Sequence, residues 1–183
     1  MFDAIEMEFS VMPKSWAIVA LNLVLVGCNQ YPDNCPVRGD GVVEIRASLD
    51  DSSNAPLPLQ KGESLVGAIV TPGTMRVDAV AVQIANGGGK ADGRLKIRVC
   101  QADLCSNGES QLMGSQDNDF LSINLNPSML INYARGPLKY TITRESGGEQ
   151  MSVWTYPTYG NIAHIQVGDQ IQQRTINMLL IQN

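Results

Sequence analysis

The chain has 183 residues, of which 44% are hydrophobic and 17% charged, and its formal net charge is −5. These values exclude a disordered polyelectrolyte and are not those of a basic nucleic-acid-binding protein. The length allows one domain with an adequate core, and 17 glycines and nine prolines with few helical patterns favour a turn-rich β protein.

An apolar run lies near the N-terminus. Residues Ser15–Gly27 follow Lys14 and are apolar apart from Ser15 and Asn22. As a helix, residues 16–26 would span ~16 Å, well short of the ~30 Å hydrocarbon core of a bilayer. The run therefore predicts the helix of a signal peptide rather than a transmembrane helix.

This run ends in Leu25-Val26-Gly27-Cys28, which resembles the bacterial lipobox, where small residues precede a cysteine that becomes the lipidated first residue of the mature protein. The resemblance implies that residues 1–27 are a signal peptide, that Cys28 is lipidated and that the lipid anchors the protein to a membrane. Asn29, which stands where Asp would favour the inner membrane, implies an outer-membrane lipoprotein. The alternative is an ordinary buried segment that contains a cysteine.

The extreme N-terminus is acidic, with Asp3, Glu6 and Glu8, whereas signal peptides begin with positive charge. A true start at Met12 would restore a basic beginning. Residues 28–40 are rich in Pro, Asn, Asp and Gly and predict a tether to a domain that spans residues 41–183.

Short segments with period-two patterning, separated by turn sequences, fill the rest of the chain. We expect eight or nine strands, at residues 42–47, 64–71, 76–85, 93–101, 109–115, 120–125, 138–144, 150–156 and 175–181. Residues 126–136 are the one stretch that suits a short helix or a long crossover. The pattern predicts an all-β fold, an antiparallel β-sandwich.

One segment carries both a clear alternation and two cysteines. Apolar side chains alternate with basic ones, as in a strand with one buried face: Leu95, Ile97 and Val99 against Arg94, Lys96 and Arg98. Cys100 and Cys105 follow, on either side of residues 101–104, which we interpret as a hairpin loop.

Cysteines that flank such a loop can approach to the distance that a disulfide requires, so we predict a bond between Cys100 and Cys105. A zinc site is the alternative, but one C-x4-C pair supplies only half of one. Cys35 is left as a free thiol, an intermolecular bridge, or the partner of Cys28 if Cys28 carries no lipid.

The order of the strands in residues 65–156 resembles the galactose-binding-like jelly-roll domains of bacterial envelope and carbohydrate-active proteins. The matching positions are Val77, Val80, Val82 and Ile84, then Leu95, Ile97 and Val99, then Leu138, Tyr140 and Ile142. The resemblance implies a jelly-roll fold and is a pattern of strands rather than a ligand motif.

Catalytic motifs are missing from the sequence. His164 is the only histidine, and neither a nucleophile elbow nor a metalloprotease motif occurs. The acidic pairs Asp117/Asp119 and Glu145/Glu149 lie in turn-like sequence, which explains them without glycoside hydrolysis. We expect no enzyme activity, no cofactor and no metal site.

Two segments are candidate binding surfaces. Trp154 and Tyr156 share one strand face, with Tyr159 on the following loop, and such aromatic side chains stack on sugar rings. Burial in the core is the alternative for Trp154. The basic row of residues 94, 96 and 98 suits an anionic polysaccharide or lipid headgroup, and a solvated outer face is the simpler interpretation.

The sequence therefore predicts a non-catalytic, lipid-anchored envelope protein whose β-sandwich binds a glycan or an envelope protein, facing the periplasm or the cell surface. The main alternative is a structural lipoprotein subunit of an envelope assembly, of the secretion or conjugation type. A carbohydrate-active enzyme comes third. A structural subunit should show an apolar patch or an unpaired edge strand, and a glycan-binding module an aromatic-lined groove.

Overall fold

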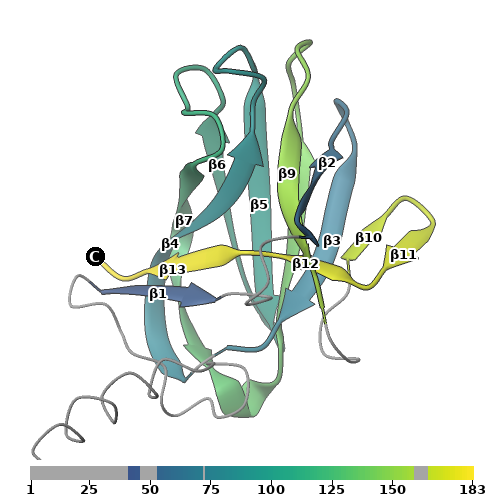
Figure 1. Cartoon of the computed structure of the whole chain (residues 1–183). Helices are drawn as coiled ribbons and strands as arrows, with labels where there is room; N and C mark the ends of the chain where they lie inside the picture. Colours follow the sequence, from purple (N-terminus) through teal and green to yellow (C-terminus); the bar gives the residue numbers. More distant parts are fainter. Residues whose placement is uncertain (1–40, 46–52, 72, 159–164) are drawn as a thin grey trace, which may run out of the picture.

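The computed structural model describes residues 41–45, 53–71, 73–158 and 165–183. The predicted signal peptide, Cys28, the tether with Cys35, Tyr159 and His164 all lie outside the described residues. Within them the chain is almost entirely β-structure, and every strand pair is antiparallel (Figure 1). The predicted all-β, sandwich-like fold is confirmed.

Thirteen strands and one short 3-10 helix make up the described part of the chain. The strands are β1 Val42–Ile45, β2 Ala55–Pro58, β3 Ser64–Ile69, β4 Thr74–Ala85, β5 Arg94–Gln101, β6 Leu104–Gln111, β7 Phe120–Asn132, β8 Leu138–Arg144, β9 Ser152–Pro157, β10 Ile165–Val167, β11 Gln170–Gln172, β12 Arg174–Ile176 and β13 Met178–Ile181. The 3-10 helix η5, Tyr133–Arg135, connects β7 to the loop before β8.

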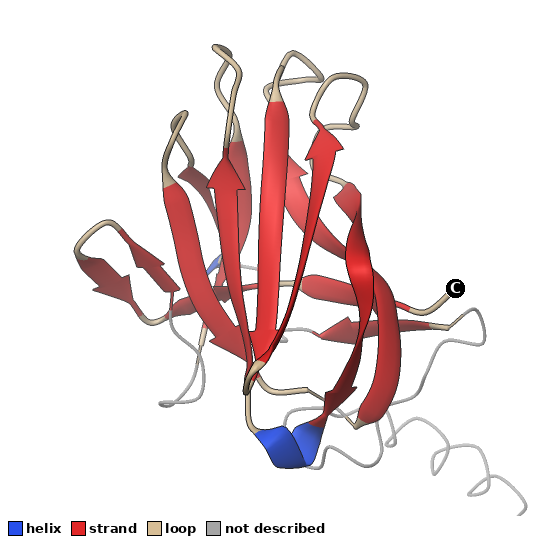
Figure 2. Ribbon diagram, turned by 180° about the vertical axis from the view of Figure 1, so that it is seen from behind, coloured by secondary structure: helices blue, strands red, loops and turns tan. Residues whose placement is uncertain are grey.

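The strands form one curled sheet in the order β1-β13-β4-β7-β6-β5-β8-β3-β10-β11, with β9 joining β2 and β12 to β4. Val82 in β4 pairs with Leu121 in β7 and with Met178 in β13, so these two strands occupy opposite edges of β4. In Figure 1, β1, β13 and β12 run across the view in front of the upright strands. Figure 2 shows the upright layer from behind, with η5 in blue at its lower end.

Period-two alternation of apolar side chains builds the core between these layers. In β5, Leu95, Ile97 and Val99 are buried, whereas Arg94, Lys96 and Arg98 are exposed, as the sequence predicted. Apolar side chains of β3, β4, β8, β9 and β13 join them in one continuous hydrophobic cluster. The basic and polar side chains of β5 therefore lie on the outer face of the sheet.

The β5–β6 hairpin contains the predicted disulfide. Cys100 and Cys105 are directly paired across the two strands with their Cα atoms 4.1 Å apart, and their sulfur atoms are bonded. The connection is shorter than the predicted loop of residues 101–104, because only Ala102 and Asp103 lie outside the strands. Ala102 has a φ of 50°, which belongs to the primed turns that suit two-residue hairpins.

The strand count exceeds the eight or nine expected, for local reasons. Residues 126–136, predicted to be a short helix or crossover, instead continue β7 as far as Asn132 and then form η5. The predicted strand at residues 175–181 is divided at Asn177 into β12 and β13. The short strands β2, β10 and β11 were not predicted.

Candidate functional site

The outer face of β7, β6, β5 and β8 carries a continuous group of polar side chains, which we call the polar face. It consists of Asn124 and Asn126 on β7, Asn107 and Glu109 on β6, Lys96 and Arg98 on β5, and Thr141, Thr143 and Glu145 on and just after β8. Each alternates with inward residues, as Asn124 and Asn126 do with buried Ile123 and Leu125. The antiparallel register therefore assembles the polar face.

Register also orders the polar face into rows across the strands. Asn126, Asn107, Arg98 and Thr141 follow one another, because each is the direct partner of the next on the neighbouring strand. The adjacent row contains Glu109, Lys96 and Thr143. Amide, hydroxyl and charged groups thus stand within cross-strand reach of one another.

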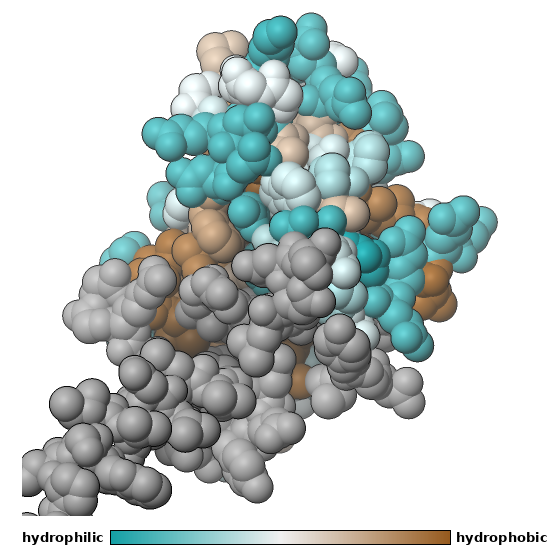
Figure 3. Space-filling model, in the orientation of Figure 1, coloured by the Kyte–Doolittle hydropathy of each residue, from teal (hydrophilic) through white to brown (hydrophobic). Residues whose placement is uncertain are grey.

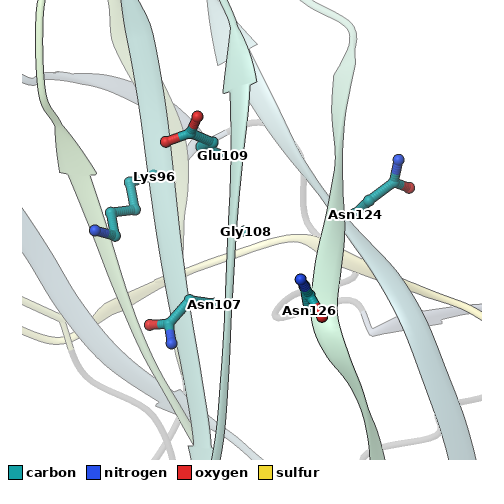
Figure 4. Close-up of a pocket in the computed structure, with 6 residues that line it drawn as sticks. All are labelled: Lys96, Asn107, Gly108, Glu109, Asn124 and Asn126. Carbon is teal, nitrogen blue, oxygen red and sulfur yellow. The ribbon is translucent and has the colours of Figure 1, made fainter.

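Two hollows adjoin on this face. One, of about 320 Å³, is lined by Lys96, Asn107, Gly108, Glu109, Asn124 and Asn126 (Figure 4). The other, of about 370 Å³, is lined by Lys96, Arg98, Asn107, Thr141, Thr143 and Glu145. Because Lys96 and Asn107 line both, the two hollows form one continuous polar depression.

Gly108 shapes the first hollow. A Cβ atom at this position would collide with the backbone carbonyl of Asn124 and lie 2.8 Å from Cγ2 of Ile123. The missing side chain lets the backbone of β7 approach β6 closely. Strands β6 and β7 are in register at one residue pair, Asn107 with Asn126. Both asparagines therefore lie where the two strands pair.

Ion pairs neutralise part of the face. Arg94 lies 3.5 Å from Glu109 and 3.9 Å from Glu145, and Lys96 lies 3.4 Å from Glu145. The side chains are 28% to 55% exposed, so each pair contributes at most about 1 kcal/mol. Arg98 differs: its Nη2 donates to Sγ of Cys105 at 3.6 Å, and it forms no ion pair among the described residues.

A buried arginine anchors the loop that follows β8. Arg144 is 3% exposed and donates to the carbonyl oxygens of Leu59 at 3.2 Å and of Glu149. The carboxylate of Asp92, 3.7 Å from its Nη2, accepts the N–H groups of Gly148 at 2.8 Å and Glu149 at 3.0 Å. These two N–H groups, with the charge of Arg144, lower the pKa of Asp92. The clamp fixes the backbone directly before Glu145.

The predicted aromatic platform is not an exposed surface. Tyr156 is only 3% exposed, and its hydroxyl donates to Oε1 of Gln83, so the expectation that it faces solvent is wrong. Trp154 is half-buried, and its Nε1 donates to Oδ1 of Asn118 at 2.9 Å. Gln83 Nε2 also donates to the carbonyl of Asn118, at 3.2 Å, so hydrogen bonds tie both aromatic side chains to β4 and its neighbouring turn. Tyr159 lies outside the described residues.

The acidic residues that the sequence places in turns, Asp117/Asp119 and Glu145/Glu149, make structural contacts. Asp117 accepts the backbone N–H groups of Asn86 at 2.7 Å and Gly88 at 3.0 Å, which organises the glycine-rich loop after β4. Among the described residues, no group of three His, Cys, Asp or Glu side chains is placed to hold a metal ion. The same part of the chain contains no helix with the length and apolar character to cross a membrane.

Comparison with protein-family profiles, with curated proteins and with solved structures found no match to this chain.

The basic row of β5 is predicted by its sequence alternation, whereas the asparagines beside it were not predicted. Asn107 precedes the strand predicted at residues 109–115, and Asn126 belongs to the segment expected to be helix or crossover. The available signal was the alternation of Asn124 and Asn126 with apolar neighbours. Assembled by register, these amides, with threonine hydroxyls and charged groups, can donate to and accept from a ligand that carries many hydroxyls.

Proposed function

We propose that the protein is a non-catalytic, lipid-anchored envelope protein whose β-sandwich binds glycans on the polar face. The observation that carries this proposal is the continuous depression formed by the two hollows that share Lys96 and Asn107. Its amide, hydroxyl and charged groups are those that recognise ring hydroxyls. The anchor at Cys28 and the placement in the outer membrane rest on the lipobox resemblance alone.

The galactose-binding-like assignment is part of the same proposal. It is supported by the sequence pattern, which places the matching residues of β4, β5 and β8 on buried strand faces. The polar face replaces the aromatic platform as the proposed ligand site, since Tyr156 is buried. Among the described residues, no aromatic side chain lines either hollow, so each site should bind weakly, and many copies on a membrane would act together.

Retention of the purified full chain on a glycan array tests this proposal. Asn107→Ala should weaken binding about tenfold, because one or two hydrogen bonds of about 1 kcal/mol each are lost from both hollows. Gln111→Ala is the matched control, since Gln111 is exposed on the same strand but lines neither hollow. No glycan retention by the wild type, or equal losses in both variants, would contradict the proposal.

One observation favours the alternative of a structural envelope subunit. Among the described strands, β11 ends the sheet order and pairs with β10 alone, and its Ile171 is 69% exposed. Figure 3 shows hydrophobic surface at the position of the β10–β11 hairpin, at the right of the view. An open strand edge with an exposed apolar side chain suits strand addition by a partner protein. Crosslinking from Ile171 in intact cells would identify such a partner.

A further inference from the structure

One end of the polar face carries two basic side chains that form no ion pair with a described carboxylate. Arg94 and Lys96 are paired with Glu109 and Glu145, whereas Arg98 has no ion pair among the described residues. Lys139 on β8 is exposed and likewise forms no ion pair in the described part of the chain. The carboxylates and their cation partners therefore gather toward one end of the face, and the two unpaired cations stand toward the other.

Register brings these two cations together. Arg98 pairs with Thr141 and Cys100 pairs with Lys139, so Arg98 and Lys139 are diagonal neighbours on adjacent strands. Their side chains share the outer face, because positions two apart on a strand point the same way. Diagonal neighbours lie about 7–8 Å apart, a spacing that one small anionic group can bridge between two long side chains.

The disulfide lies on the same face and contacts the guanidinium. Cys100 and Cys105 are in line with Arg98 and Asn107 by the two-residue period, and Arg98 Nη2 lies 3.6 Å from Cys105 Sγ. This contact and the covalent crosslink hold the arginine above a fixed hairpin. Arginine presents a planar set of donors that matches a carboxylate in a bidentate fashion.

Neutral groups flank the cationic pair. Asn107 and Thr141 are the direct cross-strand partners of Arg98, and Asn126 follows Asn107 in the same row. These side chains suit the hydroxyl groups of sugars next to an acidic one. Farther along the face, Arg94 and Lys96 are paired with Glu109 and Glu145, so neither is left as an unpaired cation to bind a second acidic group, which disfavours a densely charged polyanion.

We propose that Arg98 and Lys139 form a carboxylate subsite, and that the ligand is an oligosaccharide in which an acidic sugar alternates with neutral ones. This inference rests on the glycan-binding function proposed above and specifies its ligand class. The row of Asn126, Asn107 and Thr141 binds the neutral sugars, and the arginine and lysine bind the acid group. A phosphate headgroup shares the anionic chemistry but lacks the run of hydroxyls that this row would bind.

The test uses the purified full chain and a tetrasaccharide of alternating glucuronic acid and N-acetylglucosamine, beside its carboxyl-reduced, neutral counterpart. Titration should show the acidic form binding at least about tenfold more tightly than the reduced form. Arg98→Gln should abolish this difference, so that the acidic and the reduced forms bind this variant equally. Arg94→Gln, on the same strand and face, is the matched control and should retain the preference.

The possible outcomes separate this inference from the proposed function. Equal binding of both tetrasaccharides, or a preference that survives Arg98→Gln, overturns the carboxylate subsite. Binding of other glycans on an array but of neither tetrasaccharide also overturns it and leaves the glycan-binding function standing. Absence of all glycan binding overturns both. Displacement of the acidic tetrasaccharide by equimolar glycerol phosphate indicates a headgroup site and overturns the choice of an acidic glycan. Matching thermal melts of the two variants confirm that both are folded.

Discussion

Gly67 and Tyr140 face each other across the β3–β8 pair. Because they pack closely, the effect of Gly67→Ala on the free energy of unfolding should change sign when Tyr140 is replaced by leucine. The three atoms nearest to a Cβ built on Gly67 all belong to the distal ring and hydroxyl of Tyr140, and the third lies 3.0 Å away. Tyr140 is fully buried in the core, so its ring has little room to move. The backbone of Gly67 does not have a positive φ and can accept an alanine.

The size of the effect is the difference between two terms. Overpacking of this kind costs about 1–3 kcal/mol, while replacing a strand glycine by alanine contributes about 0.5–1 kcal/mol of stability. Gly67→Ala should therefore lower the free energy of unfolding by up to about 2.5 kcal/mol. In a Tyr140→Leu background the three colliding atoms are missing, so the same substitution should raise it by about 0.5 kcal/mol.

Urea denaturation of the four proteins of this double-mutant cycle measures the coupling directly. We expect a coupling free energy of about 1–3 kcal/mol between the two positions. Equal effects of Gly67→Ala in both backgrounds would show that the ring does not limit the space above Gly67. A stabilising effect of Gly67→Ala in the wild type would refute the packing argument outright.

Three further predictions concern the anchor, the tryptophan and the acid response. Palmitate labelling in cells should mark the wild type and not Cys28→Ala; equal labelling would remove the basis for the envelope location. Trp154→Phe should lower the free energy of unfolding by about 1 kcal/mol, through loss of the bond to Asn118, and an unchanged urea midpoint would contradict this. Because the folded-state pKa of Asp92 is lowered, its contribution is present above its unfolded pKa of about 3.9 and is lost as the pH falls. Asp92→Asn should reduce the loss of unfolding free energy between about pH 5 and pH 2. The same loss in the variant as in the wild type would contradict a stabilising role of Asp92 in the loop after β8.

Sequence periodicity was sufficient to predict the position of a strand where one face of the strand is apolar and the other is charged. Residues 93–101 predicted β5 almost to the residue, and with it the disulfide that follows. Sequence periodicity failed for β10 and β11, because three residues are too few to distinguish a strand from a loop by alternation. Residues 55–58 hold two prolines, which argue against a strand, yet they form β2 at the margin of the sheet, where β9 is its one partner among the described strands.

The candidate site was harder to predict than the fold, because its residues become neighbours only through strand register. Asn107 and Asn126 are separated in the sequence by a turn and by most of two strands, and neither belongs to a recognisable motif. Tyr156 illustrates the converse: a tyrosine two residues from a tryptophan suggested an exposed platform, but its side chain is buried and its hydroxyl donates to Gln83. Alternation along a strand predicts which of its two faces a side chain occupies. Which face is then buried depends on how the strands pack in the folded protein.

Strands β1 and β13 pair although they lie near opposite ends of the described chain, so β1 can form this pairing only after β13 has been synthesised. Backbone hydrogen bonding also joins Gln182 to Gly41 at 3.0 Å, and β13 in turn completes one edge of β4. During synthesis the residues of β1 and β4 leave the ribosome long before those of β13, so both wait with unsatisfied strand edges. Such non-local pairing is slow to form and exposes edges to aggregation in the meantime. A chain interrupted before Met178 would lack β13 and would leave those edges of β1 and β4 unpaired.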